Sequence, residues 1–216
     1  MNSKAKRLTT LAMLSAIAYI IMAVGRIPVV LFLKYDPKDV VITIGGLLFG
    51  PLSAFTVSAV VSFVEMVTLS DTGFIGFVMN VISTCAFACT AAFMYKNNKT
   101  LKGAVKGLIS GSLVMTGVML LWNYLVTPIY LGYPREVVAK MLIPAFLPFN
   151  LLKGGLNAAF TMLLYKPLVN SLRRSNLVPA STQDEQPQKV NTGVILISGL
   201  VIVTCILLVL VLNGTI

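Results

Sequence analysis

The chain has 216 residues, of which 57% are hydrophobic and only 11% are charged, and its mean hydropathy is +0.90. A soluble domain carries roughly 25% charged residues, so this composition excludes an ordinary globular protein and indicates an integral membrane protein. One span needs about 20 apolar residues, so the length allows six or seven helices and no second, soluble domain. The 17 Lys and Arg against 7 Asp and Glu give a net charge of +10, which in this setting indicates basic cytoplasmic loops rather than nucleic-acid binding.

The residue types that the sequence lacks exclude several kinds of chemistry. There is no histidine, which removes His-based acid–base catalysis and any His-ligated metal site. No P-loop of the form Gly-x-x-x-x-Gly-Lys-Ser/Thr occurs, so energy for uphill transport would come from an ion gradient or from a partner. The three cysteines, Cys85, Cys89 and Cys205, lie in apolar stretches and are interpreted as packing residues.

The apolar stretches predict a core of six helices and one additional span. The core helices are expected at residues 8–30, 37–49, 51–69, 74–95, 103–126 and about 138–172, with external segments at 31–36, 70–73 and 127–137. After them come a flexible linker rich in Asn, Pro, Ser and Gln and an apolar helix at 194–212. We therefore expect an all-α membrane protein with a six-helix domain at 1–174, a linker at 175–192 and an additional C-terminal helix within 193–216.

Loop charge predicts a tight helical hairpin at Gly50-Pro51. Lys and Arg concentrate on the cytoplasmic side of a membrane. With the N-terminus inside, this turn is needed to bring all three basic clusters to that side: Lys4, Lys6 and Arg7; Lys96, Lys99, Lys102 and Lys106; Lys166, Arg173 and Arg174. Glycine suits the end of one helix and proline the first turn of the next. The first arm is too short for a full crossing, so we expect it to pack against protein rather than lipid.

The first span carries two further patterns. Ala12-x-x-x-Ala16 makes a stripe of small residues, which lets another helix approach closely. The basic start of the span and the pair Ala16-x-Ala18 also fit a cleaved signal peptide, which is the competing interpretation. The apolar run continues past that pair to Val24, and this favours a retained helix.

Lys153 is the most informative polar residue, because an unpaired charge at membrane depth is costly and usually functional. It lies within Asn150-Leu-Leu-Lys153-Gly-Gly-Leu-Asn157, and this spacing places Asn150, Lys153 and Asn157 on one helix face. Amides beside an ammonium group offer donors and acceptors for a polar, planar ligand edge. The alternatives are that Lys153 extends outward to the interface or pairs with Glu65.

Two other polar positions have both a structural and a functional interpretation. Asn123 lies near the expected outer end of the fifth helix, where it would cap that end, bond a neighbouring helix, or face a ligand. Asp36 before Pro37 is typical of a helix N-cap, and an ordered external loop at this point would also cover a pocket. The nearby aromatic residues Trp122, Tyr124, Tyr130 and Tyr133 would belong to the interfacial belt or stack on an aromatic ligand.

These features together resemble the S components of the energy-coupling factor (ECF) vitamin transporters, specifically the riboflavin-binding S component. The resemblance covers about residues 5–172. It rests on Lys34-Tyr-Asp36-Pro-Lys-Asp39 running into Ile44-Gly-Gly-Leu-Leu-Phe-Gly50-Pro51, on Gly73-Phe-Ile-Gly76-Phe-Val-Met-Asn80, and on Asn123…Pro128 followed by Asn150-x-x-Lys153. The helix at 194–212 lies outside the six-helix plan of these proteins, and Glu65 receives no role from the resemblance.

The resemblance implies a six-helix bundle that binds riboflavin near its external face, under the loop between the first two helices. Asparagine and lysine suit the alternating donor and acceptors of the flavin's uracil-like edge, apolar side chains suit its ring, and Asp36 or Thr43 would serve the ribityl hydroxyls. The residues expected at this substrate site are Leu33, Tyr35, Asp36, Thr43, Phe77, Asn80, Asn123, Tyr130, Phe149, Asn150 and Lys153.

The resemblance also implies partners and a location. The chain would work with a transmembrane coupling subunit and two cytoplasmic ATPase subunits, and the stripe of Ala12 and Ala16 would dock on the coupling subunit. We expect a multi-pass protein of a prokaryotic plasma membrane with a cytoplasmic N-terminus, and riboflavin as a transported ligand with no cofactor or metal. The alternatives are an S component for a different vitamin or an autonomous ion-coupled carrier using Glu65 and Lys153. An intramembrane enzyme is disfavoured, because the sequence lacks histidine, a paired-carboxylate motif and a Gly-x-Ser-x-Gly elbow.

Overall fold

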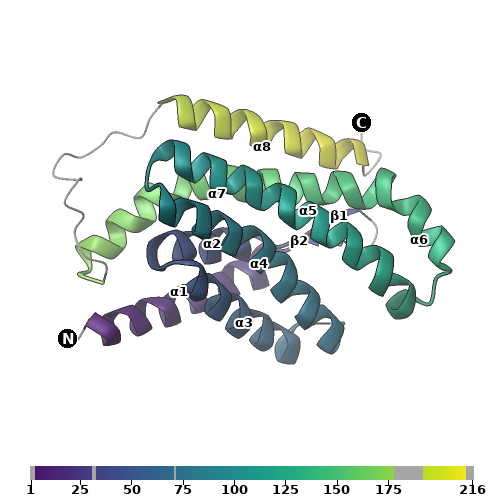
Figure 1. Cartoon of the computed structure of the whole chain (residues 1–216), viewed down its shortest axis with the longest axis horizontal. Coiled ribbons are helices and arrows are strands. Elements are labelled where there is room, and N and C mark those ends of the chain that lie inside the picture. The colour runs from purple at the N-terminus through teal and green to yellow at the C-terminus, as the bar shows by residue number, and fades with distance from the viewer. Residues whose placement is uncertain (1–2, 31–32, 71, 178–191, 213–216) are drawn as a thin grey trace.

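The structure is a computed structural model that describes residues 3–30, 33–70, 72–177 and 192–212. Its elements in chain order are α1 (Ser3–Gly25), β1 (Ile27–Val30), β2 (Leu33–Tyr35), α2 (Lys38–Phe49), α3 (Pro51–Thr68), α4 (Gly73–Asn97), α5 (Leu101–Leu131), α6 (Arg135–Met141), the π-helical segment η1 (Leu142–Phe146), α7 (Leu147–Arg174) and α8 (Thr192–Leu212). The long helices lie along the long axis of the molecule, with α8 beside α7 at one edge and α1 and α3 at the other (Figure 1).

Six stretches within the described residues are long and apolar enough to cross a membrane. They are Lys4–Gly25, Pro51–Thr68, Gly73–Asn97, Leu101–Leu131, Arg135–Arg174 and Thr192–Val211. The short helix α2 is different, because ten consecutive residues from Lys38 to Leu47 are buried. This confirms that the first arm of the predicted hairpin packs against protein on all sides.

The predicted turn at Gly50-Pro51 is confirmed. Gly50 has a φ of 93°, a left-handed conformation that favours glycine, and its N–H donates to the Gly46 carbonyl over 2.7 Å to end α2. Pro51 then opens α3. A Cβ added to Gly46 would lie 2.9 Å from the Ala54 Cβ, so the two arms of the hairpin approach too closely for a larger residue.

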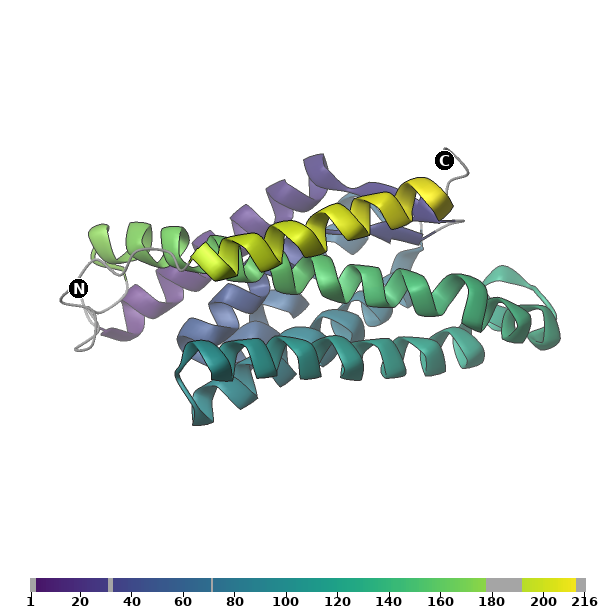
Figure 2. The ribbon, with the colours of Figure 1, turned by 90° about the horizontal axis from the view of Figure 1, so that it is seen from above.

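The hairpin brings the three basic clusters together as loop charge predicts. The start of α1, the connection between α4 and α5 and the end of α7 all lie at one end of the bundle, on the left in Figures 1 and 2. The β1–β2 pair and α6 lie towards the other end. The bundle therefore has one strongly basic end, which is the arrangement that a multi-pass membrane protein needs.

The first helix is shorter than predicted, and the segment after it is not a simple loop. α1 ends at Gly25, and residues 27–30 form β1, which pairs antiparallel with β2. The expected helix end at residue 30 is therefore wrong. Pro28 lacks the N–H that a helix interior needs, and the β-branched residues around it favour an extended chain. α1 itself packs into the bundle, because Leu14, Ala18 and Met22 are fully buried.

The external segment predicted at 127–137 is also largely helical. α5 continues through Pro128 to Leu131 and ends at Gly132, whose φ is 68°. α6 begins three residues later, and η1, with Pro144 inside it, joins α6 to α7 in one continuous helical stretch. A proline removes only one backbone hydrogen bond, and a long membrane helix tolerates this loss.

Three groups of buried side chains hold the bundle together, and the smallest joins Val40 and Ile44 of α2 to Val169 of α7. The largest group joins α1, α2, α3, α4 and α5, where Gly107 and Gly111 let α5 approach α4 so closely that an added Cβ would meet the Ala91 and Phe87 carbonyl oxygens at 2.8 and 2.6 Å. The second group joins β1 and β2 to α6, η1, α7 and α8. The predicted domain boundaries remain a prediction, because residues 178–191 of the linker lie outside the described residues.

Candidate functional site

A cavity opens between the β1–β2 pair and helices α3, α4, α5 and α7. Its empty volume is about 1030 Å³, including the space that is open to solvent. The apolar part of its lining includes Leu33, Met79, Met119, Trp122 and Phe149, and its polar part includes amides and charged groups from five elements. A largely apolar cavity with a few convergent polar groups is the usual form of a small-molecule site.

Eight of the eleven residues predicted for the substrate site line this cavity. They are Leu33, Asp36, Asn80, Asn123, Tyr130, Phe149, Asn150 and Lys153. They come from β2, the connection between β2 and α2, α4, α5 and α7, so the fold joins positions that are up to 120 residues apart (153 minus 33).

The other three predicted residues are placed elsewhere. Thr43 is fully buried, and its hydroxyl donates to the Asp39 carbonyl one turn back over 2.6 Å. Phe77 points away from the cavity, with its ring centroid 6.3 Å from that of Phe63 and 6.0 Å from that of Phe74, both exposed on the outer surface. Tyr35 is buried behind the cavity wall. None of these three residues lines this cavity, and their predicted role in substrate binding stays a prediction.

Lys153 is buried at the cavity wall with only 7% of its surface exposed, and its charge is paired. Its Nζ lies 3.1 Å from Asp39 Oδ2 and donates to Ser83 Oγ over 3.3 Å. Asp39 is completely buried and also accepts a 2.7 Å hydrogen bond from Thr84 and a 3.3 Å hydrogen bond from the Asn157 amide. The alternative pairing of Lys153 with Glu65 is therefore wrong, and Asp39 is the carboxylate that neutralises Lys153.

Tyr35 supports this ion pair from behind. Its hydroxyl donates to Asn157 Oδ1 over 3.0 Å, and the Asn157 amide nitrogen in turn reaches Asp39. Burial, followed by the nearby charges of Asp39 and Asp36, raises the pKa of Tyr35, so the phenol keeps the proton that it donates. Of the predicted face of Asn150, Lys153 and Asn157, the first two line the cavity and the third orients the ion pair.

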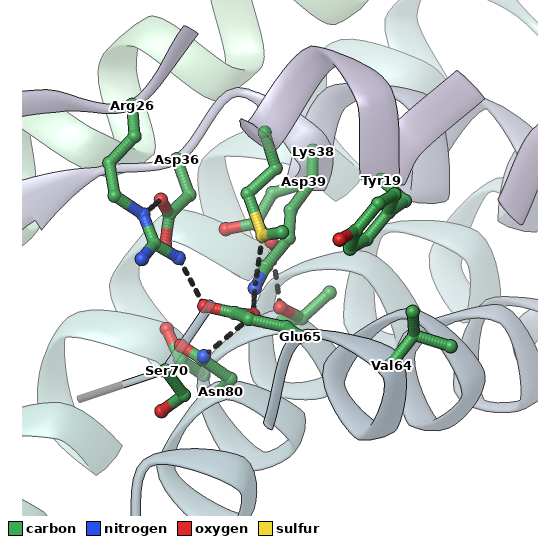
Figure 3. A network of polar contacts seen from close by, with 12 residues as sticks. Tyr19, Arg26, Asp36, Lys38, Asp39, Val64, Glu65, Ser70 and Asn80 are labelled. Atoms are coloured by element: carbon green, nitrogen blue, oxygen red, sulfur yellow. Dashed lines mark hydrogen bonds and ion pairs between the residues drawn. The ribbon is translucent and has the colours of Figure 1, made fainter. Parts of the chain in front are cut away.

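A second network surrounds Glu65, to which the sequence assigns no role. Its carboxylate accepts from Arg26 and from Lys38, and the Asn80 amide donates to it over 3.0 Å (Figure 3). Arg26 Nε also donates to Asp36 Oδ1 over 2.7 Å. Burial alone would lower the pKa of Arg26, but the two carboxylates outweigh it and raise that pKa. The open end of the β1–β2 pair is thus tied through Arg26 to Glu65 of α3, which also bonds Asn80 of α4.

Asp36 does not cap α2. The residue at the N-cap is Pro37, which offers no side-chain hydrogen bond, whereas Asp36 turns to Arg26 and to the cavity. The proposed cap role for Asp36 is wrong, because the neighbouring guanidinium is a stronger partner for a carboxylate than a backbone N–H.

The two asparagine side chains at the cavity are held by their own helices. The Asn123 amide donates to the Met119 carbonyl over 2.7 Å and accepts from Thr127 over 3.0 Å, and the Asn150 amide donates to the Phe146 carbonyl over 2.7 Å. An amide nitrogen carries two hydrogens, so each can still donate into the cavity. Asn123 lies inside α5 rather than at its end, so its interpretation as a helix cap is wrong.

The comparisons with known proteins identify the family. Residues 6–165 match the family model described as "ECF transporter, substrate-specific component". The chain belongs to this family. It is 31% identical over 179 residues to the riboflavin transporter RibU of Staphylococcus aureus, covering 78% of this chain and 93% of that protein. It is 27% identical over 190 residues to the riboflavin transporter FmnP of Bacillus subtilis, covering 81% and 99%.

A solved structure gives the same assignment. It is described as "Structure and mechanism of the S component of a bacterial ECF transporter", and it matches with a TM-score of 0.67 and 31% identity over 79% of this chain and 99% of that one. The predicted S-component fold is thereby confirmed. Since the family is a transporter component, this S component is a multi-pass membrane protein and not an enzyme.

Several lining residues of this S component escaped the sequence analysis. Arg26, Ser83 and Thr127 belong to this group, and so do Met79 and Met119. Helical spacing carried a usable signal for α4, since Gly76, Met79, Asn80 and Ser83 share a face at intervals of three and four residues. No comparable signal marked Arg26, because the strand that follows it reads as a continuation of the first apolar span.

Proposed function

We propose that this chain is the riboflavin-binding, substrate-capture subunit of an ECF transporter in a prokaryotic plasma membrane. The observation that carries the proposal is the cavity in which Asn123, Asn150 and Lys153 meet beneath the β1–β2 pair. Family membership supports the transporter role, and two similar proteins that are named riboflavin transporters support the ligand.

The cavity suits the chemistry of riboflavin. The isoalloxazine ring is flat and largely apolar, and Met79, Met119 and Phe149 offer matching surfaces. Its uracil-like edge alternates acceptors with a donor, which asparagine amides and a lysine ammonium group can complement. The ribityl hydroxyls then face Asp36 or the neighbouring polar wall. A site of this kind discriminates strongly, because a ligand without these groups leaves buried polar atoms unpaired.

Purification in detergent followed by an absorbance spectrum tests the ligand. We expect the protein to bind riboflavin in a one-to-one complex, seen as a visible flavin band and quenched flavin fluorescence, and to ignore thiamine at the same concentration. Binding of a different vitamin in place of riboflavin would support the alternative S component. Proton-driven transport by the isolated chain in vesicles would instead support the autonomous carrier.

The same proposal includes the partners that supply energy. The chain would work with a transmembrane coupling subunit and two cytoplasmic ATPase subunits. Ala12 and Ala16 support this assignment, because both are exposed on α1, whereas Leu14 and Ala18 of the same helix face the core. A stripe of small exposed residues allows a partner helix to approach closely.

Membrane orientation follows from the basic end of the bundle, which we place in the cytoplasm together with the N-terminus. A cysteine introduced at Asn98 should react with a membrane-impermeant thiol reagent only from the cytoplasmic side, and one at Tyr133 only from outside. The physical reason is the positive charge around Asn98, which disfavours translocation of that loop. The chain without an introduced cysteine is the control, and the opposite labelling pattern would contradict this orientation.

A further inference from the structure

The additional helix α8 has one face that packs against the bundle. Ser198 and Cys205 are buried, and Val201, Ile202 and Val209 pack in the second group of buried side chains. These positions recur at intervals of three and four residues, so they form one seam along the helix. The opposite face, with Leu196, Leu200 and Leu207, is exposed. α8 is therefore seated on the protein in a definite rotation and presents its other side to lipid.

α8 and α7 lie close together at Gly155. A Cβ added to Gly155 of α7 would lie 3.5 Å from Cys205 Sγ and 3.7 Å from a Val201 methyl group, in direct van der Waals contact. The Cys205 thiol points to the Leu152 carbonyl at 4.0 Å. Small residues at such a contact are typical of helices that associate within a membrane.

A single layer of side chains lies between the buried face of α8 and the substrate cavity. α8 contacts β1 as well as α7. Its buried residues belong to the same group as Val29 and Leu33 of the β1–β2 pair and Phe149 and Leu152 of α7. Of these, Leu33 and Phe149 line the cavity. α8 therefore lies behind two neighbouring walls of the site and contacts both.

We propose that α8 is a positioning element of the substrate site: it holds β1 against α7 and thereby slows the release of bound substrate. This inference rests on the proposed function. The family match ends at residue 165, before α8 begins, so α8 is an addition to the six-helix plan.

α8 would act because a protein helix restricts the motion of the residues that it packs against more than lipid does. Lipid tails are as apolar as α8, so hydrophobicity does not distinguish the two, but a fixed helix holds its packing partners in one arrangement whereas lipid follows their motion. The β1–β2 pair with its flanking residues supplies Arg26, Leu33 and Asp36 to one wall of the cavity, so movement of this wall would widen the way out for bound substrate. Because α8 packs behind this wall, it lowers the rate at which the wall opens.

Two substitutions separate α8 from its seat without altering a residue of the cavity lining. Cys205→Trp overfills the seam from the side of α8, and Gly155→Leu overfills it from the side of α7. Leu207→Trp places the same bulky side chain on the exposed face of α8, where 49% of Leu207 is accessible, and is the matched control. The measurement is the dissociation rate of riboflavin from the full chain, followed by the recovery of flavin fluorescence after mixing with an excess of a non-fluorescent competitor.

Both seam variants should release riboflavin on the order of three- to tenfold faster, the size of a lost interhelical contact, while Leu207→Trp releases it at the original rate. The rate constant is independent of the folded fraction, so partial misfolding lowers the amplitude but does not imitate the effect. Unchanged rates in both seam variants, or an equal acceleration in the control, would overturn the proposal. Acceleration by Gly155→Leu alone would assign the effect to α7 and overturn it too. Failure of the unaltered chain to bind riboflavin would instead contradict the proposed function, and the α8 proposal would fall with it.

Discussion

Lys153→Met should weaken riboflavin binding by about 1–3 kcal/mol, because the flavin edge loses its charged donor. The same substitution should destabilise the protein by about 3–5 kcal/mol, because it leaves Asp39 as a buried, unneutralised carboxylate. Asp39 is fully buried and lies 3.1 Å from the Lys153 ammonium group, so water does not replace the lost partner. Isothermal titration and thermal unfolding in detergent measure the two losses separately.

A second substitution separates the effect on riboflavin affinity from the effect on protein stability. In the double variant Lys153→Met with Asp39→Asn, both charges are gone, and the asparagine keeps an acceptor for Thr84. Stability should return to near that of the unaltered chain, since removal of both partners of a buried pair costs little. Riboflavin affinity should stay low. Lys140→Ala, on the exposed surface of α6, controls for loss of a positive charge at this end of the bundle. Unchanged affinity in Lys153→Met would remove Lys153 from the site.

The helical architecture was predictable because its signals are local. Loop charge and the dipeptide Gly50-Pro51 placed the hairpin correctly, and apolar stretches located the remaining spans. The ends of elements were less predictable. Residues 27–30 are as apolar as the helix before them, so hydropathy alone does not separate a short strand from a continuing span. Pro28 was the available signal for that break.

The site was predictable in its polar lining but not in its pairing. An intramembrane lysine between two asparagines can be recognised from the sequence as a candidate site residue, because a charged group within the membrane is costly unless it is paired or binds a ligand. The partner of Lys153 carries no such mark. Asp39 and Asn157 are separated by 118 positions, and only the fold shows that they meet. Glu65 illustrates the same limit, since its partners Arg26 and Lys38 lie in the two preceding expected helices, and only the fold shows that they meet Glu65.

The pairing explains how a protein with few charges tolerates so many in its interior. Three cations, Arg26, Lys38 and Lys153, meet three carboxylates, Asp36, Asp39 and Glu65, in two adjoining networks. Three of the seven acidic residues of the chain thus lie in these two networks. Their charges cancel, which a low-dielectric interior requires, and the bonds fix the walls of the cavity in place. Binding of a neutral ligand then leaves this balance undisturbed.

Ala16→Trp, and equally Ala12→Trp, should abolish vitamin uptake in cells that contain the coupling and ATPase subunits, while riboflavin affinity of the purified protein stays unchanged. Both alanines are exposed. At a rise of 1.5 Å per residue, Ala16 lies about 15 Å along the axis of α1 from Arg26, which lines the cavity. A bulky ring at either position would keep a partner helix from close contact but would not reach the ligand.

The control for docking is a tryptophan on another exposed surface. Leu113 of α5 is 61% exposed, so Leu113→Trp adds the same bulk towards lipid without changing α1. This variant should transport at the original rate. Normal transport by Ala12→Trp and Ala16→Trp would mean that the coupling subunit docks elsewhere on the bundle. Equal loss in the Leu113 variant would mean that added bulk, and not the face of α1, limits uptake. Binding measurements with each purified variant connect the result to the site, because a docking surface changes transport and leaves capture intact.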